Sequence, residues 1–476
     1  MLILALESST SSAKALLFDP ENGVVDTADA PYDDNGLILE QGVTDTDGVF
    51  RLTASLGKRL AEGKTVDAVA LCGTFHSMAV CGGAMDGGKT YAWNYMAPSA
   101  LCARARADAA LVDRLYNATG CMPHVTYMRQ TMRYLRENGL DLSDKLLPSQ
   151  GAYNFYKLTG AFCESVSTAS GFGLLNIHTL DYDADALAYA GVRRGQLGAL
   201  VTYKDTRPLS DAGAKLLGIR SGVPVVAAHP DGALNQIANG AAVVGRMTLS
   251  IGTSGAIRLT SDHPILPENK DLWCYYGVTD WLSGAAISSA CNCINWFKET
   301  CLGDRYSFKE LEREEDVGQP IPVFLPFVFG ERCPGWRDDR LGGFMEVTPA
   351  HTAVELHRAL QAGILFNLYQ CYEVLCRDVG APDRIIVSGG VLNSKQWTQM
   401  IADIFRHELT LVKNINASSV GAAVLGAHAA GALGDVTAYT AEIDGARTVA
   451  PRAELADYYA QQYRRYLRWY ALTKAV

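Results

Sequence analysis

Short apolar stretches alternate with longer amphipathic stretches along the whole chain. The short ones, such as residues 66–73, 223–228 and 384–388, have the length and composition of buried strands. The longer ones carry apolar residues at helical spacing and predict helices. Because strands and helices alternate in two comparable halves, we expect two α/β domains with a cleft between them. The expected helices cover residues 49–62, 100–119, 127–138, 151–158, 233–239, 288–302, 353–379, 397–406, 419–432 and 453–471.

Each half of the chain opens with the same design, an apolar strand, a hydroxyl-rich turn and a second apolar strand. The first copy covers residues 2–18, with the turn Ser8-Ser9-Thr10-Ser11. The second covers residues 248–258, with the turn Gly252-Thr253-Ser254-Gly255. Glycine lets the backbone approach a ligand closely, and free amides and hydroxyls donate to phosphate oxygens. An ordinary hairpin explains either copy alone, but two copies favour a pair of loops that face one phosphate chain.

Length and composition agree with this division. A chain of 476 residues is too long for a single core. A hydrophobic content of 48% and a charged content of 20% fit a soluble globular protein. The symmetry of the two halves places a boundary near residues 240–247, so we expect an N-terminal domain over residues 1–244 and a C-terminal domain over residues 245–476.

Charge and cysteine usage exclude several classes of partner. The net charge of −9 and the lack of a basic run argue against nucleic acid and anionic membranes, so an anionic substrate needs a local cationic pocket. No apolar run of about 18 residues predicts a membrane span, and the first apolar stretch serves better as a strand than as a signal peptide. The 12 cysteines include no Cys-x-x-Cys pair, which favours reduced thiols in a cytoplasmic protein; Cys291-Asn292-Cys293 only hints at metal or redox chemistry. The sequence is compatible with a homodimer but does not fix the oligomeric state.

Several segments, in order and at characteristic separations, resemble the FGGY carbohydrate kinases, which belong to the fold group of sugar kinases, Hsp70 and actin. The likeness covers nearly the whole chain and looks strongest toward bacterial gluconokinases. It implies two ribonuclease-H-like domains that flank a cleft. The segments that carry it are residues 251–258, Leu325-Pro326-Phe327, Gly330-Glu331-Arg332-Cys333-Pro334-Gly335-Trp336, Gly389-Gly390 followed by Trp397 and Gln399, and residues 417–423.

The resemblance assigns the catalytic base. Asp231 stands where these kinases keep the residue that takes the proton from the sugar hydroxyl. A carboxylate at the end of a strand that faces a cleft suits this role, because phosphoryl transfer needs a positioned proton acceptor and in-line geometry. The alternative is an aspartate that caps the helix expected from Ala233.

The resemblance also implies ATP and magnesium as cofactors. Lys14 either neutralises phosphate charge or is a solvated strand lysine. A triphosphate needs a hard divalent cation. At the metal position the family usually has an aspartate where this chain has Glu7, which either reaches the ion through a water or misplaces it. The expected nucleotide contacts are Thr10 and Lys14 in the first phosphate loop, Gly252, Thr253, Ser254 and Gly255 in the second, and Gly389, Gly390 and Asn393 in an adenosine site. The alternative for the last group is a plain strand-to-helix turn.

The sugar site departs from the family pattern. Trp93 and Asn94 match the family's sugar-contacting positions, but Tyr95 replaces the acid that usually follows, and the next arginine is gone. His76 is retained, and Ser165 stands where an aspartate is usual. By resemblance His76 contacts a sugar hydroxyl or carboxylate; otherwise it is a satisfied core histidine. Trp93 either stacks on a sugar face or fills the core.

We therefore expect ATP-dependent phosphorylation of a terminal hydroxyl on a small sugar or sugar acid, with gluconate to 6-phosphogluconate as the first choice. A kinase for a ketose or polyol such as xylulose is one alternative. A non-catalytic nucleotide- or sugar-dependent switch on the same fold is another. Glu331 and Arg332 are expected to be structural residues, and His124 matches a family histidine only weakly.

Overall fold

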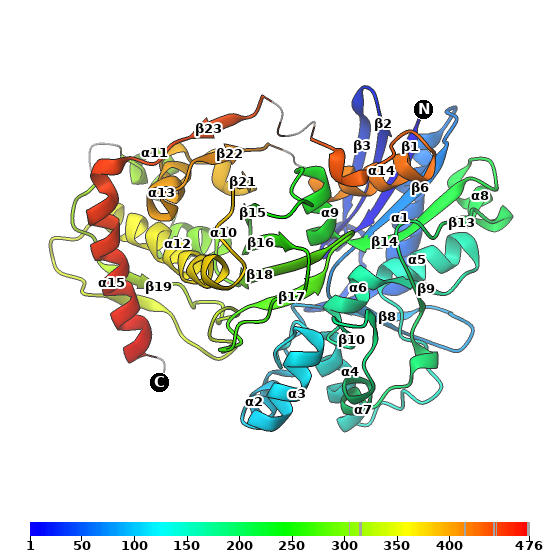
Figure 1. The fold of residues 1–476 in the computed structure, drawn as a ribbon, viewed down its shortest axis with the longest axis horizontal. Helices are drawn as coiled ribbons and strands as arrows, with labels where there is room; N and C mark the ends of the chain where they lie inside the picture. The colour runs from blue at the N-terminus through cyan, green and yellow to red at the C-terminus, as the bar shows by residue number, and fades with distance from the viewer. Residues whose placement is uncertain (304, 314–316, 414–415, 441–442, 444, 474–476) are drawn as a thin grey trace.

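The computed structural model describes the chain except residues 304, 314–316, 414–415, 441–442, 444 and 474–476. The chain forms two lobes, each built around a twisted sheet with helices on both faces (Figure 1). The N-terminal half forms most of one lobe, and the second half, ending in α15 (Ala456–Leu472), forms the other.

The first sheet is mixed and has the order β13-β14-β6-β1-β2-β3. Strand β1 pairs antiparallel with β2 and parallel with β6, which in turn pairs parallel with β14. All six residues of β1 and all six of β6 are buried, as their continuous apolar sequences predict for strands covered on both faces. The strands are β1 (Ile3–Ser8), β2 (Ser12–Asp19), β3 (Gly23–Pro31), β6 (Ala68–Gly73), β13 (Arg207–Pro208) and β14 (Pro224–Pro230).

The second sheet repeats this topology in the order β17-β18-β16-β15-β21-β22-β23. Its strand β15 again pairs antiparallel with the next strand, β16, and parallel with β21. The repeated antiparallel–parallel order is the expected ribonuclease-H-like fold in two copies. The strands are β15 (Arg246–Ile251), β16 (Gly255–Ser261), β17 (Trp273–Tyr276), β18 (Trp281–Ile287), β21 (Arg384–Ser388), β22 (Leu409–Leu411) and β23 (Arg447–Val449).

Helix α14 (Ala417–Ala429) comes from the second half of the sequence but packs on β1, β6 and β14 of the first sheet, beside α9 (Asp231–Ala238). Figure 1 shows α14, in orange, among the blue strands of the N-terminal half. Small residues permit this contact, since a Cβ added at Gly421 would lie 2.1 Å from the carbonyl oxygen of Leu234. The division of the chain at residue 244 therefore stays a prediction, because the two halves interlock here.

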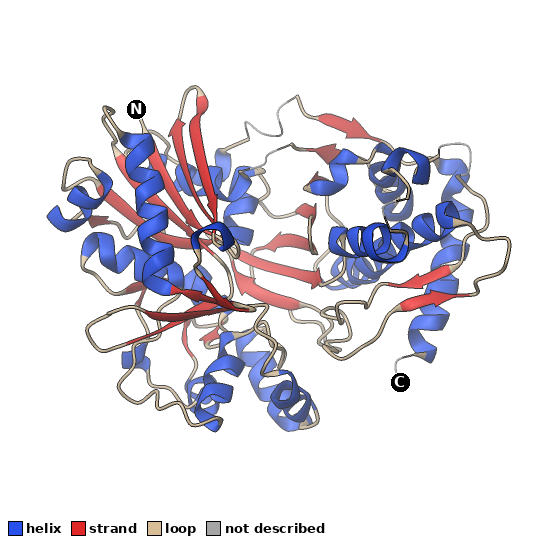
Figure 2. Cartoon of the chain, turned by 180° about the vertical axis from the view of Figure 1, so that it is seen from behind, coloured by secondary structure: helices blue, strands red, loops and turns tan. Residues whose placement is uncertain are grey.

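Several other helices pack on the two large sheets, and others form a separate group in the first lobe (Figure 2). In the first lobe, α1 (Thr46–Ala61) packs on β1 and β2, and α5 (Gln150–Thr159) packs on β14. In the second, α12 (Ala353–Asp378) packs on β16 and β18. A small sheet in the order β4-β5-β8-β7 and a helical subdomain complete the first lobe. The remaining elements are β4 (Ile38–Glu40), β5 (Val43–Asp45), β7 (Ser77–Cys81), β8 (Gly88–Ala92), β9 (Cys163–Ser165), β10 (Leu175–Asn176), β11 (Asp181–Tyr182), β12 (Ala199–Val201), β19 (Val323–Leu325), β20 (Gly343–Met345), α2 (Ser99–Arg106), α3 (Ala109–Thr119), α4 (Met128–Glu137), α6 (Val166–Gly171), α7 (Ala184–Ala190), α8 (Asp211–Leu217), α10 (Cys291–Trp296), α11 (Phe308–Leu311) and α13 (Lys395–Phe405).

Two of the expected helices differ from the structure. The pattern over residues 100–119 contains two helices, α2 and α3, because the side chain of Asp108 accepts the amide hydrogen of Leu111 at 3.0 Å and starts a new helix. The helix expected over 288–302 begins only at Cys291 and ends in a π-helical turn over Phe297–Cys301. Among the described residues, no helix is long and apolar enough to cross a membrane.

Candidate active site

A cavity of about 220 Å³ lies between the two lobes, and we call it the cleft pocket. Its walls include Thr10, His76, Trp93, Asp231, Ser254 and Arg332, so both halves of the sequence contribute. A second cavity of about 350 Å³, which we call the side pocket, is lined by residues that include Glu7, Ser11, Lys14, Ser250 and Ser418. Three residues line both cavities, namely Thr10, Asp231 and Arg258.

Asp231 lies where β14 ends and α9 begins. Its Oδ1 accepts the amide hydrogen of Gly232 at 2.7 Å, but the residue that caps α9 is Pro230. The helix start therefore fixes the carboxylate in place, and the carboxylate still faces both pockets. Burial raises the pKa of Asp231, while the neighbouring guanidinium of Arg258 opposes that rise. This combination gives a carboxylate that is basic enough to accept a proton and close to a positive charge.

The two hydroxyl-rich turns meet at the cleft pocket. Thr10 of the first turn and Ser254 of the second line the same cavity. The second turn is tight, because the amide of Gly252 donates to the carbonyl of Ser254 at 2.9 Å. Gly255 also lines the cavity, whereas Thr253 is exposed to solvent beyond it. The hydroxyls of the two lobes thus face one space, as a pair of phosphate loops requires.

Glu7 is buried in the wall of the side pocket and accepts hydrogen bonds from residues of the second half of the sequence. Its Oε2 accepts hydrogen bonds from Ser418, at 2.8 Å, and from Ser419 of α14, and its Oε1 lies 3.5 Å from the Lys14 ammonium. Burial alone would lower the pKa of Lys14, but Glu7, together with Cys72 and Asp231, outweighs the burial and the pKa is raised. Lys14 is thus a paired cation at a cavity wall rather than a freely solvated lysine.

The donor chemistry of the side pocket fits magnesium. Glu7 and Asp231 are the two carboxylates that line it, and serine and threonine hydroxyls add further hard oxygen atoms. In the described part of the chain, no cluster of three or more His, Cys, Asp or Glu side chains forms a metal cage of its own. A magnesium ion bound mainly by phosphate oxygens and water, with few protein ligands, agrees with both observations.

His76 and Trp93 lie in the cleft pocket. The Nδ1 of His76 is 2.6 Å from the carbonyl oxygen of Gly171, so Nδ1 carries the proton and Nε2 is left as an acceptor. Burial and the Arg332 charge lower the pKa of His76 to about 3, which keeps the ring neutral. Trp93 donates from Nε1 to the Thr10 hydroxyl at 3.0 Å. Both side chains are therefore placed to contact a polar ligand.

Six predicted site residues do not line the two pockets, namely Gly252 and Thr253 of the second turn, Asn94, Gly389, Gly390 and Asn393. Asn94 lines an adjacent cavity of about 250 Å³, and its buried Oδ1 has no hydrogen-bond partner among the described residues. Gly389, Gly390 and Asn393 are exposed at the end of β21. Gly389 has a φ of +99°, and a Cβ there would lie 2.5 Å from the carbonyl oxygen of Ile251. The adenosine motif thus lies directly beside the second hydroxyl-rich turn.

Sequence reasoning missed three contributors to the pockets. Arg258 follows the second turn along β16, and its Nη1 donates to Ser250 at 3.2 Å. Tyr275 stacks on Trp273 with ring centroids 4.1 Å apart and forms a wall of the cleft pocket. Arg332, expected to be structural, also lines this pocket. The signal for Arg258 was present, because strand alternation from Ser254 turns Ala256 and Arg258 to one face.

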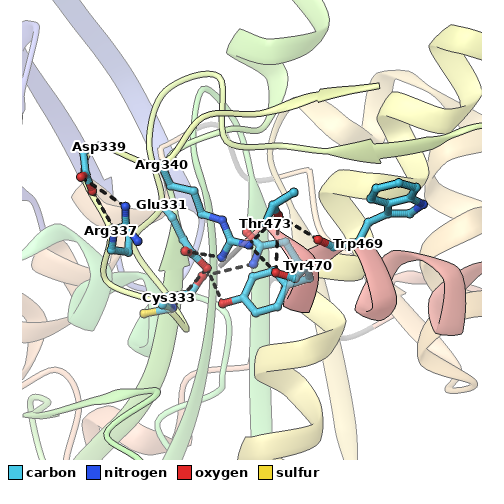
Figure 3. A network of polar contacts seen from close by, with 10 residues as sticks. Glu331, Cys333, Arg337, Asp339, Arg340, Trp469, Tyr470 and Thr473 are labelled. Carbon is cyan, nitrogen blue, oxygen red and sulfur yellow. Dashed lines mark hydrogen bonds and ion pairs between the residues drawn. The ribbon is translucent and has the colours of Figure 1, made fainter. Parts of the chain in front are cut away.

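The neighbouring Glu331 does have the expected local salt bridge. It binds the guanidinium of Arg340 at 2.9 Å and the hydroxyl of Tyr470 at 2.7 Å (Figure 3). Because Tyr470 belongs to α15, this network ties the loop after β19 to the C-terminal helix. Elsewhere, His124 and Arg106 of the first lobe contact Asp338 of the same loop, with Arg106 at 3.2 Å. His124 therefore joins the lobes and does not line the cleft pocket.

Two ribonuclease-H-like lobes around a cleft, with a carboxylate where two polar cavities meet, define the architecture of a two-lobed sugar kinase. The chain superposes on the crystal structure of a gluconate kinase from Lactobacillus acidophilus with a TM-score of 0.92, at 23% identity, covering 100% of this chain and 98% of that one. The models of the FGGY family of carbohydrate kinases match residues 2–238 (N-terminal domain) and 247–430 (C-terminal domain). The chain belongs to this family.

Two relatives differ in the sugar that their names specify. A gluconokinase from Bacillus licheniformis is 31% identical over 329 residues, which are 64% of this chain and 63% of the relative. A xylulose kinase from Staphylococcus epidermidis is 29% identical over 267 residues, which are 55% of this chain and 54% of the relative. The chain thus matches less than two thirds of the length of either relative.

Proposed function

We propose that this protein transfers the terminal phosphoryl group of ATP to a terminal hydroxyl of a small polyhydroxy substrate. The observation that carries the proposal is the position of Asp231, whose carboxylate faces the cleft pocket on one side and the side pocket on the other. A base that deprotonates the acceptor alcohol must stand where the substrate and the phosphoryl group meet.

Each of the two substrates is assigned to one pocket. The sugar occupies the cleft pocket, where Nε2 of His76 accepts a hydrogen bond from a hydroxyl and Trp93 offers an apolar face. The triphosphate extends from the side pocket between the two hydroxyl-rich turns, where Lys14 supplies positive charge. Asp231 accepts the proton of the attacking hydroxyl, and Arg258 stabilises charge on the transferring group from within the same chain.

The cofactor assignment follows from the same geometry. Gly389, Gly390 and Asn393 present an exposed backbone surface next to the second turn, which suits the adenosine of a nucleotide whose phosphates enter the cleft. Glu7 would hold a magnesium ion at the side pocket, and the bound ion would supply positive charge to the triphosphate. Closure of the lobes excludes water and favours transfer to the sugar over hydrolysis.

We propose gluconate as the substrate, with 6-phosphogluconate as the product. The higher identity to the gluconokinase and the two guanidiniums in the cleft pocket support an anionic sugar acid. The second candidate is xylulose, favoured by the match to a xylulose kinase at nearly the same identity. In either case the acceptor is a terminal alcohol.

A substrate panel with coupled detection of ADP tests the choice. The purified protein is assayed with ATP and magnesium on gluconate, xylulose, ribulose and glycerol, and the phosphorylated product is identified by mass. We expect gluconate to have the highest kcat/KM. A kcat/KM for xylulose or ribulose that equals that for gluconate overturns the gluconate assignment, and no ADP release above the substrate-free rate with any compound overturns the kinase itself.

A further inference from the structure

We infer that Arg332 binds the carboxylate of an anionic polyhydroxy substrate and thereby selects sugar acids over neutral sugars of the same length. The inference rests on the proposed function and specifies the substrate class of its cleft pocket. Arg332 is then a specificity-determining residue rather than the structural one that the sequence predicts.

Among the described residues, no carboxylate pairs with the guanidinium of Arg332 to balance its charge. Only 9% of the residue is exposed, it lines the cleft pocket, and its Nε is buried without a hydrogen-bond partner among the described residues. Its recorded contact is the ring of Trp93, 5.7 Å from the guanidinium carbon. A buried cation in this state is costly unless a ligand completes its hydrogen bonds.

Two other buried arginines, Arg129 and Arg340, also leave Nε without a partner, but the protein binds their terminal nitrogens. Arg129 donates from these nitrogens to the hydroxyl of Thr119 and to the carbonyls of Gly173 and Cys121. Arg340, eight residues after Arg332, binds Glu331 and the carbonyl oxygen of Tyr470. In comparison with these two arginines, Arg332 has no side-chain hydrogen bond to the described residues, and it lines the cleft pocket.

The backbone holds Arg332 in a fixed position. The preceding residue, Glu331, turns away to the network of Arg340 and Tyr470 that anchors this loop to α15 (Figure 3). The carbonyl of Arg332 accepts the amide hydrogen of Trp336 at 2.6 Å, and the amide of Cys333 donates to Ala286 at 3.1 Å. A side chain mounted on so constrained a loop is preorganised for a planar anion, and a guanidinium binds carboxylate through two parallel hydrogen bonds.

The charged side chains that line the cleft pocket leave one positive charge for an anionic ligand to balance. Asp231 is the carboxylate that lines it, and Arg258 is the cation that stands beside Asp231, where both also face the side pocket. The His76 ring is neutral. Arg332 remains as an uncompensated positive charge, set against Trp93 rather than against Asp231.

This arrangement orients the substrate. The terminal hydroxyl lies at Asp231 and the carboxylate, at the other end of the carbon chain, lies at Arg332. A neutral ketose or alditol in the same pocket leaves the guanidinium buried and unpaired, and a site built for a polar partner rejects a substrate that lacks it.

A matched pair of ligands isolates this one contact. D-gluconate and D-glucitol share their hydroxyl configuration and differ at one end, where a carboxylate replaces a hydroxymethyl group. Their binding to the wild-type protein and to Arg332→Gln and Arg332→Lys variants is measured by titration calorimetry, and kcat/KM is measured in parallel. Arg337→Gln serves as the control, because it removes a positive charge from the same loop. Arg337 forms an ion pair with Asp339 at 2.8 Å (Figure 3).

We expect Arg332→Gln to weaken gluconate binding by about 100-fold and to leave glucitol binding within about threefold, so that the preference for the acid disappears. Arg332→Lys keeps the charge but loses the planar pair of donors. Its affinity for gluconate should therefore fall between those of the wild type and Arg332→Gln. Arg337→Gln should bind both ligands as the wild type does. Near-wild-type melting temperatures show that the variants are folded.

Three results overturn the inference. The first is an equal loss for gluconate and glucitol in Arg332→Gln, which marks a structural residue. The second is wild-type protein that binds gluconate no better than glucitol. The third is loss of the preference in an Arg258→Gln variant but not in Arg332→Gln. Binding is read without turnover, so these outcomes differ from failure of the proposed kinase, in which ligands bind but no ADP forms.

Discussion

The pKa of Asp231 depends on its place at the start of a helix, where it lines two cavities. Burial favours its protonated form, and the Arg258 guanidinium favours the charged form. The balance leaves the pKa of Asp231 above that of an ordinary aspartate. Such a group accepts a proton more readily than a solvated carboxylate does.

The pH dependence of activity follows from this balance. A base works only when it is deprotonated, so kcat/KM should fall as the pH drops through the pKa of Asp231, above the ordinary aspartate range. Because Arg258 opposes the rise, Arg258→Gln should shift this acidic limb to higher pH. His76 adds no limb between pH 5 and 8, since burial lowers its pKa to about 3.

The measurement is kcat/KM against pH for the wild type, for Arg258→Gln and for Arg194→Gln. Arg194 lies on the surface, where it pairs with Asp181, so its replacement should leave the limb in place. An acidic limb that stays unchanged in Arg258→Gln contradicts the electrostatic role assigned to Arg258.

At the scale of single residues, the sequence predicted which residues share a cavity better than it predicted which residues they contact. Motif positions put Asp231, Thr10, His76 and Ser254 in one cavity, because each follows a strand end that the apolar pattern marks. Asn94 lies in a neighbouring cavity, since β8 ends just before it and the chain turns away. The serine partners of Glu7 lie more than 400 residues along the chain. No local pattern reveals such a pair.

At the scale of elements, α14 links the two halves of the chain. It packs on β1 and β6 and carries the Ser418 and Ser419 hydroxyls to Glu7. It also packs on α9, the helix that begins at Asp231. Its alanine and glycine content predicts a tightly packed helix, but periodicity alone does not tell which sheet the helix covers.

A methyl group at Gly421 should disturb this contact. In Gly421→Ala the added Cβ would lie 2.1 Å from the Leu234 carbonyl oxygen, so α9 and α14 must separate. We expect a loss of about 1–3 kcal/mol in the free energy of unfolding and a lower kcat, because Asp231 moves with α9. Chemical denaturation and the coupled assay measure both effects.

Gly434→Ala is the matched control for that experiment. Gly434 follows α14, has no positive φ, and an added Cβ would meet nothing within 4 Å. Its stability and kcat should stay at the wild-type values. A Gly421→Ala variant that behaves in the same way would show that the α9–α14 contact does not position the catalytic carboxylate.

The same comparison explains which elements the sequence predicted. Long amphipathic helices such as α1 and α12, and strands buried on both faces such as β6, agree with their apolar patterns because burial dictates those residues. Strand β3 was missed, since it is a mostly exposed edge strand with no continuous apolar run. The break between α2 and α3 depends on one capping side chain, Asp108, inside an otherwise helical pattern.

At the scale of the whole molecule, hydrogen bonds join the two lobes. The Tyr116 hydroxyl donates to the carbonyl of Leu272 at 2.8 Å, and the Tyr127 hydroxyl lies 2.9 Å from that of Tyr275. The chain also crosses back, because α14 of the second half packs in the first lobe and binds Glu7 there. We expect motion of the lobes to pivot about these contacts, with the two turns and Asp231 at the interface.

The most direct test of this account is turnover in Asp231→Asn. The change preserves the shape of the side chain but removes the base, so kcat should fall by about 100- to 10,000-fold while gluconate and ATP still bind. Asp211→Asn is the control, because Asp211 also opens a helix, α8, but is exposed and lines neither pocket. ADP release is measured for both variants and the wild type, with binding measured by calorimetry. A kcat within a few-fold of the wild type in Asp231→Asn contradicts the account.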